Sequence, residues 1–172
     1  MKLQSVHHVA YKCADPEDTR AFYEDVLGLP MVLTVDLTRK PSTGEPEAHY
    51  FHFFFELADG SCIAFFDLSD GEMPLPSPNV PIWTNHLAIR AGSVDELHEW
   101  RRRLEAAGVT VDAEIDHHFC RSIYFYDPNR VRLEITVDTP GGDFAEQSRE
   151  DARRAFDDWL ERRVRQNPAL AN

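Results

Sequence analysis

The chain has 172 residues, enough to bury a substantial core, and its 42% hydrophobic and 28% charged residues are ordinary for a globular protein. Its net charge of -12 argues against nucleic acid or an anionic membrane surface as a partner, because both attract surfaces rich in Lys and Arg. The sequence contains no apolar run of about 18 residues and no leader-like start, so we expect a cytoplasmic protein that acts on a small molecule or another protein.

The first part of the sequence, residues 5–69, predicts one strand, one helix and three further strands. Apolar and polar residues alternate along the opening strand, so His8 points to the face opposite Val9 and Tyr11. A helix follows, because Asp15 is a suitable N-terminal cap and is followed by proline and two acidic residues. The expected strands are residues 5–12, 31–37, 50–57 and 61–68.

The same order of elements returns after a proline-rich linker at residues 70–82. His86 opens the second copy as His8 opens the first, and each histidine lies seven residues before the residue that caps the next helix. We therefore interpret residues 83–138 as a second βαβββ module, with Ser93 as the cap of its helix. The expected elements are a strand at 84–91, a helix at 93–107, a strand at 110–114 and a hairpin within 122–136.

Residues 139–172 lie outside the duplication and predict a helical extension. A Pro-Gly-Gly sequence interrupts the chain, and a charged helix is expected to begin at Asp143. We expect its apolar side to pack on the same chain; the alternative is a contact between two copies in a homo-oligomer. That side consists of Ala152, Phe156, Trp159, Leu160 and Val164.

The last hairpin carries an acidic residue on the face opposite its apolar residues. Leu133 and Ile135 share one face of the second strand, and Glu134 points to the other. Taken alone, such a residue is usually only solvated, because the second face of a half-buried strand is polar. The interpretation of Glu134 therefore depends on the rest of the chain.

The two modules, with a histidine at the first strand of each and a glutamate on the last strand, resemble the vicinal oxygen chelate superfamily, which includes glyoxalases, extradiol dioxygenases and fosfomycin-resistance proteins. The resemblance covers residues 5–138 and implies an α+β fold, in which the two modules form a curved sheet around a divalent metal. It rests on His8-Val9-Ala10, Phe22-Tyr23, Val26-Leu27-Gly28-Leu29, His86-Leu87-Ala88, Tyr124-Phe125-Tyr126-Asp127-Pro128-Asn129 and Leu133-Glu134.

The resemblance places His8, His86 and Glu134 on the metal-ligand positions of that superfamily. Strand periodicity supports this set, since each proposed ligand lies on the face opposite the apolar packing residues. Two imidazoles and one carboxylate leave positions open for substrate and O₂, so Fe(II) is the expected metal and Mn²⁺, Ni²⁺ and Zn²⁺ are alternatives. The fourth ligand position of the superfamily falls on Ala64, and ring-cleaving dioxygenases leave that position empty.

The resemblance also suggests residues that act on the substrate. Tyr124 lies ten residues before Glu134, the spacing of the substrate-contacting tyrosine in extradiol dioxygenases, although packing within a strand explains it equally well. The acid/base histidine of those enzymes maps to Ser61, so another imidazole would have to carry the proton. His52 and His118 are the first candidates, because they lie on or beside strands of the expected sheet. The remaining candidates are His49 and His117.

The sequence therefore predicts an Fe(II)-dependent, extradiol-like dioxygenase that cleaves a catechol-type aromatic substrate with O₂. Two alternatives stay open. One is a glyoxalase-like metal-dependent lyase or isomerase, in which the metal acts only as a Lewis acid. The other is a protein of the bleomycin-binding kind, which would sequester a small molecule in an aromatic cavity without metal.

Overall fold

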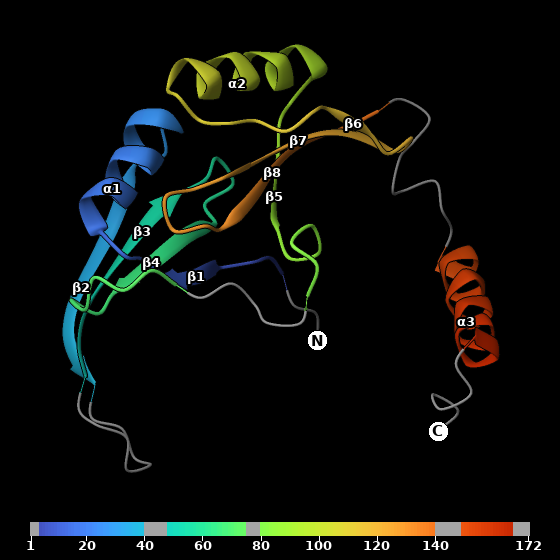
Figure 1. Cartoon of the computed structure of the whole chain (residues 1–172), viewed down its shortest axis with the longest axis horizontal. Helices are drawn as coiled ribbons and strands as arrows, with labels where there is room; N and C mark the ends of the chain where they lie inside the picture. The colour runs from blue at the N-terminus through green and yellow to red at the C-terminus, as the bar shows by residue number, and fades with distance from the viewer. Residues whose placement is uncertain (1–3, 40–47, 75–79, 140–148, 167–172) are drawn as a thin grey trace.

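The computed structural model describes residues 4–39, 48–74, 80–139 and 149–166 (Figure 1). The strands are β1 (His8–Lys12), β2 (Met31–Arg39), β3 (Ala48–Glu56), β4 (Cys62–Asp67), β5 (Leu87–Arg90), β6 (Ile115–Asp116), β7 (Cys120–Tyr126) and β8 (Arg132–Asp138). The helices are α1 (Pro16–Arg20), which continues as the π-helix η1 (Ala21–Val26), then α2 (Val94–Ala106) and α3 (Arg149–Gln166).

Two four-stranded sheets repeat one topology. Their strand orders are β1-β4-β3-β2 and β5-β8-β7-β6. In each sheet the first strand of the copy pairs in parallel with the last, and the remaining pairs are antiparallel. The expected α+β fold of two tandem βαβββ modules is therefore confirmed.

The helix ends follow the expected capping chemistry. The Asp15 carboxylate accepts two main-chain N–H groups of the first turn, at 2.8 and 2.9 Å, and the Ser93 hydroxyl accepts one at 3.2 Å. The first helix ends before Gly28, whose φ of 73° suits a residue without a Cβ. Its second half differs from the expected α-helix, because the Leu27 N–H donates to the carbonyl of Phe22, five residues earlier.

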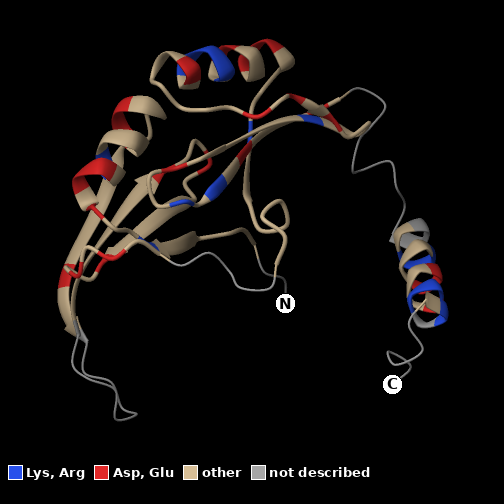
Figure 2. Ribbon diagram, viewed as in Figure 1, with Lys and Arg blue, Asp and Glu red and all other residues tan. Residues whose placement is uncertain are grey.

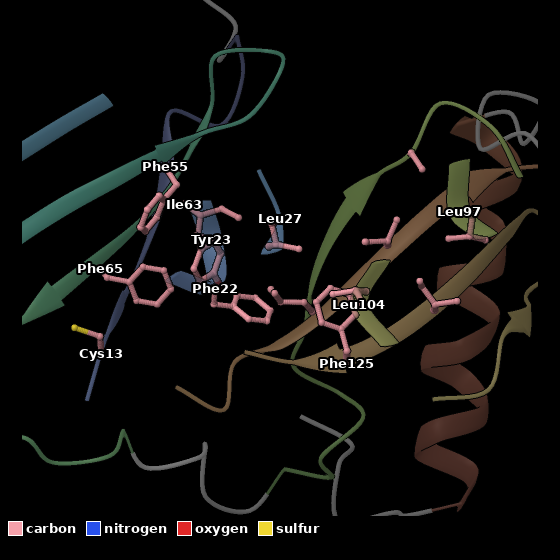
Figure 3. Close-up of a cluster of buried hydrophobic side chains, with 14 of the residues drawn as sticks. Cys13, Phe22, Tyr23, Leu27, Phe55, Ile63, Phe65, Leu97, Leu104 and Phe125 are labelled. Carbon is pink, nitrogen blue, oxygen red and sulfur yellow. The ribbon is translucent and has the colours of Figure 1, made fainter. Parts of the chain in front are cut away.

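One apolar core joins the two modules. The first helix and α2 lie over the apolar faces of the sheets, and Figure 3 shows Leu27 between the aromatic residues of the first module and the leucines of α2. Charged residues are spread over the helices, whereas the strands of the first sheet carry few (Figure 2). The largest fully buried side chains include Tyr23, Phe53, Phe55, Phe65, Phe125, Leu97, Leu104 and Leu133.

Two expectations differ from the structure. The strand expected at 110–114 is replaced by the two-residue β6, because the chain meets β7 irregularly: the Asp112 N–H donates to the Tyr124 carbonyl before the regular pairing begins at Ile115. The apolar side of α3 was expected to pack on its own chain, yet within the described residues Phe156 and Trp159 remain 53% and 51% exposed. Asp143, the expected start of this helix, lies outside the described residues.

No helix in the described parts of the chain is both long enough and apolar enough to cross a membrane.

The turn between β7 and β8 joins the second module to the first. The Asn129 side chain accepts the Ala14 N–H at 2.9 Å and donates to the Thr19 hydroxyl at 3.0 Å. The Tyr23 hydroxyl donates to the Asp127 carboxylate at 3.1 Å. Because these groups are buried, the loss of one partner would leave another polar group unsatisfied, and we expect the turn to hold the two modules in register.

We expect Asp127 to make the stability of the protein depend on pH. Burial raises the pKa of this carboxyl to about 6 from 3.8, so the folded chain holds a proton that the unfolded chain releases. Its stabilising contribution is therefore fully present below about pH 4 and is lost as the pH rises through about 6. Between pH 4.5 and 7 the free energy of unfolding should fall by about 2 kcal/mol more in the wild type than in Asp127→Asn. Urea unfolding at both pH values measures this difference, and equal pH dependence in the two proteins would contradict it.

Candidate metal centre

Glu134 and His86 form the centre of a polar cluster in the second module. Glu134 lies on β8, in register with Ala88 of β5 and Tyr124 of β7, and it is only 5% exposed. Its neighbours in sequence, Leu133 and Ile135, belong to the core on the other face. The carboxylate Oε2 lies 2.9 Å from the Nε2 of His86, so an imidazole nitrogen and a carboxylate oxygen converge at one point.

Tyr124 stands beside this pair and is held from two sides. Its hydroxyl lies 3.0 Å from the Nε2 of His117, and the Arg132 guanidinium lies over its ring, with Cζ 4.2 Å from the centroid. The ring also meets His86 edge-on, with centroids 5.8 Å apart. Burial, and then the negative charge of Glu134, raise the pKa of the Tyr124 phenol. Tyr124 is therefore a protonated phenol at neutral pH and can donate a hydrogen bond.

The first module contains a second, more aromatic cluster around His8. The His8 ring centroid lies 6.3 Å from that of His52 and 5.4 Å from that of Phe54. Ala10, Ala64 and Phe54 stand in register on β1, β4 and β3, as Ala88, Glu134 and Tyr124 do on β5, β8 and β7. Ala64 is thus the counterpart of Glu134, and its methyl group offers no donor at that position.

His52 is a buried and neutral imidazole. Its ring stacks on Phe66 with the centroids 3.6 Å apart, and its Nδ1 lies 2.8 Å from the carbonyl oxygen of Phe65. Burial lowers the pKa of His52, so the ring is uncharged at neutral pH. A carbonyl oxygen only accepts hydrogen bonds, so the neutral ring of His52 must carry its proton on Nδ1. Nε2 is then the basic nitrogen.

The structure brings only part of the predicted ligand set together. His86 and Glu134 are in contact, whereas His8 contacts His52 and Phe54 instead. Among the residues with described placement, no group of three or more His, Cys, Asp or Glu side chains could hold a metal ion. The assignment of His8 as the third ligand therefore stays a prediction.

Of the candidate acid/base histidines, the structure brings His117 to Tyr124, whereas the sequence patterns placed His52 and His118 first. His118 is exposed and lies in a tight turn with a positive φ of 72°, whereas its neighbour His117 reaches the Tyr124 hydroxyl. A residue with a left-handed conformation interrupts the alternation of side chains along a strand. Counting positions back from Tyr124 therefore could not show whether His117 or His118 points toward Tyr124. His49 is exposed and pairs with Asp36 at 2.6 Å.

The donors at this centre fit a divalent transition metal. Imidazole nitrogen and carboxylate oxygen are ligands that Fe(II), Mn²⁺ and Zn²⁺ accept, and His86 and Glu134, whose Nε2 and Oε2 atoms lie 2.9 Å apart, would hold such an ion together. Tyr124 stands close enough to meet a molecule bound at the same point.

Residues 5–135 match the family profile described as the Glyoxalase/Bleomycin resistance protein/Dioxygenase superfamily. The chain belongs to this superfamily. The superfamily resemblance drawn from the sequence motifs is therefore confirmed.

The names of similar proteins refer to different functions. The chain is 32% identical over 148 residues to the Bacillus subtilis (strain 168) protein named "Putative ring-cleaving dioxygenase MhqA", a match that covers 82% of this chain and 42% of that protein. The chain thus spans about two fifths of the length of this relative. Its fold is similar to that of a glyoxylase/bleomycin resistance protein/dioxygenase domain from Frankia sp. EAN1pec, with a TM-score of 0.61, 19% identity and coverage of 80% of this chain and 100% of the other.

The fold is also similar to that of FosX, a fosfomycin resistance protein from Listeria monocytogenes. The TM-score is 0.58 at 21% identity, over 82% of this chain and 98% of FosX. At such identities the likeness concerns the fold alone.

Proposed function

We propose that this protein is a metal-dependent, extradiol-like dioxygenase that cleaves a catechol-type aromatic ring with O₂. The observation that carries the proposal is the contact between His86 and Glu134 beside a protonated Tyr124. The ring-cleaving name of the relative MhqA supports the same reaction class.

The metal ligands of this proposal are His8, His86 and Glu134, with Fe(II) as the first choice and Mn²⁺, Ni²⁺ and Zn²⁺ as alternatives. When bound, Fe(II) would supply Lewis acidity and a redox-active centre for the reaction of the substrate with O₂. In this proposal the donors come from β1, from the segment just before β5 and from β8, and the core residues behind β8 keep the Glu134 carboxylate on the polar face.

Tyr124 orients the substrate in this proposal. As a protonated phenol it can donate a hydrogen bond to a substrate oxygen, and Arg132 limits the movement of its ring. Arg132 is itself held by the Trp83 carbonyl, to which its guanidinium donates at 2.9 Å. A substrate-orienting side chain is effective only when its own position is fixed, and these contacts supply that restraint.

An imidazole would carry the proton of the substrate hydroxyl. The contact with Tyr124 favours His117 for this role, because a proton can pass between its Nε2 and the phenol. His52 and His118 remain proposals for the same role. His52 is neutral at pH 7 and therefore able to accept a proton, but it lies in the cluster around His8.

Two other functions have specific support. The likeness in fold to FosX, for which a crystal structure contains Mn(II), is compatible with a lyase, isomerase or related Lewis-acid enzyme. The aromatic surroundings of His8 are compatible with a sequestering protein, since Phe54, Phe66 and His52 could stack on a flat ligand.

Oxygen uptake distinguishes the three functions. Protein reconstituted anaerobically with Fe(II) should consume O₂ in step with catechol loss when air is admitted, and protein loaded with Zn²⁺ should not, because Zn²⁺ passes no electrons. Turnover of a hemithioacetal or a 2-oxo thioester without O₂, on Zn²⁺ or Mn²⁺, would replace the oxygenase by the lyase or isomerase. Tight binding of an aromatic compound to metal-free protein, without either activity, would favour sequestration.

A further inference from the structure

The two modules differ at one equivalent turn, which connects β3 to β4 in the first module and β7 to β8 in the second. Phe54 and Tyr124 are counterparts, so Leu57 of the first turn stands where Asp127 stands in the second, and Asp59 stands where Asn129 stands. In the second turn these positions make buried polar contacts with the first module. The first turn carries the apolar Leu57 at the matching place and cannot form the same contacts.

A cavity of about 290 Å³ lies at this place, between the first turn and the helix side of the second module. Both modules contribute to its wall. The apolar lining residues are Leu27, Leu29, Leu57 and Ala58 from the first module and Ile89, Trp100 and Ile135 from the second. Because the fold repeats, the contact of the β7–β8 turn with the first module and the contact of the β3–β4 turn with the second module are equivalent. The first contact is polar, and the second encloses this apolar cavity.

The two charged residues of the lining are engaged with other groups. Arg90 pairs with Asp138 at 3.0 Å, and the Asp59 carboxylate accepts the Ser61 hydroxyl at 2.6 Å. The remaining lining is aliphatic or aromatic and offers water few hydrogen-bond partners, so the cavity favours an uncharged apolar occupant over water.

The volume of the cavity limits the size of that occupant. An apolar protein cavity of about 150 Å³ is known to bind benzene. The present cavity is partly open to solvent and has a volume of about 290 Å³, which leaves room for a substituted single ring or for two fused rings.

We propose that this cavity is a second ligand site, separate from the candidate metal centre, for a neutral aromatic molecule of one or two rings. Ile135 lines the cavity and Glu134 belongs to the metal centre, and these adjacent residues of β8 face opposite sides of the sheet. The proposal does not depend on the reaction catalysed, because none of the lining residues belongs to the candidate metal centre.

Indole is a suitable probe, since it is neutral and has two fused rings. Metal-free wild-type protein should bind one indole per chain, observed by ligand-detected NMR and by a rise in melting temperature with indole concentration. Two cavity-filling variants, Leu57→Trp and Leu29→Phe, should each weaken binding at least about tenfold. The control Leu37→Trp places the same large side chain at an exposed position on β2 and should leave binding unchanged. The variant Glu134→Gln should also bind as the wild type does, because it alters only the other face.

The same measurements can overturn the proposal. No indole binding to the wild type, or equal binding by the wild type and by those filled variants that retain a cooperative melting transition, would mean that the cavity takes no such ligand. A dimer that dissociates in both filled variants and on addition of indole would instead assign the cavity to the contact between two copies. Loss of binding in Glu134→Gln would place indole at the metal centre.

Discussion

Replacing Glu134 by glutamine should reduce metal affinity by more than the roughly 10- to 100-fold that substitutions of outer-shell residues cost. The amide keeps the volume of the side chain but lacks the charge that a divalent ion requires from its only carboxylate ligand in the proposed set. Replacing His86 by alanine should have a similar effect, because its Nε2 is the donor that meets Glu134 at 2.9 Å. Titration with Mn²⁺ or anaerobic Fe(II), followed by metal analysis after gel filtration, measures both losses.

Two matched controls test whether the loss of metal comes from the loss of a ligand. Each control removes a carboxylate or an imidazole that lies outside the candidate centre. Asp138→Asn removes a carboxylate from the same strand, and that carboxylate pairs with Arg90 outside the candidate centre. His98→Ala removes an imidazole on α2 that pairs with Glu114. Both controls should bind metal as the wild type does. Full metal occupancy in Glu134→Gln, with the controls unchanged, would reject the centre.

The variant His8→Ala tests the third ligand separately. The resemblance predicts that it loses metal as completely as His86→Ala does, whereas the structure places His8 with His52 and Phe54. Retention of metal by His8→Ala would keep His86 and Glu134 as ligands and would require a different third ligand. Loss of metal would mean that His8 reaches the pair in the metal-bound protein, through movement within the chain or from a second copy.

Local sequence patterns predicted the elements because the relevant physics is local. Asp15 and Ser93 cap their helices through hydrogen bonds from main-chain N–H groups only two or three residues further along the chain, so the cap residue itself predicts the contact. The alternation around Leu133 and Ile135 likewise determines the face on which Glu134 lies. These features need no knowledge of how the modules pack.

Features that depend on distant contacts could not be predicted in the same way. The distance between His8 and His86 depends on the packing of two sheets that are separated by a linker, and no local pattern reports it. The exposure of Trp159 depends on where α3 lies relative to the rest of the chain. The contact of His117 with Tyr124 depends on the left-handed conformation of His118, and a non-glycine residue gives little indication of such a conformation in sequence.

His117→Ala should lower the turnover of catechol by about 10²- to 10⁴-fold, the range that general acid–base groups contribute. His117 is the imidazole that lies 3.0 Å from the Tyr124 hydroxyl, so its removal breaks the path by which a proton could leave the substrate. Tyr124→Phe should lower turnover and also raise KM, because it removes both the partner of His117 and a hydrogen-bond donor to the substrate. Metal content should stay unchanged in both variants, since neither residue belongs to the proposed ligand set.

His118→Ala and His52→Ala are the necessary comparisons, because both residues are candidates for the same role. His118 lies next to His117 but is exposed in a turn, so its loss should leave turnover close to that of the wild type. His52 stacks on Phe66 in the other cluster, and its loss should mainly affect the stability of the first sheet, as measured by melting temperature. A drop of about 10²-fold or more in either comparison, with His117→Ala fully active, would transfer the proton-carrying role to that residue. Removal of the group that carries the proton must slow the step in which the proton moves. Full activity in all three variants would therefore mean that the reaction needs none of these three imidazoles.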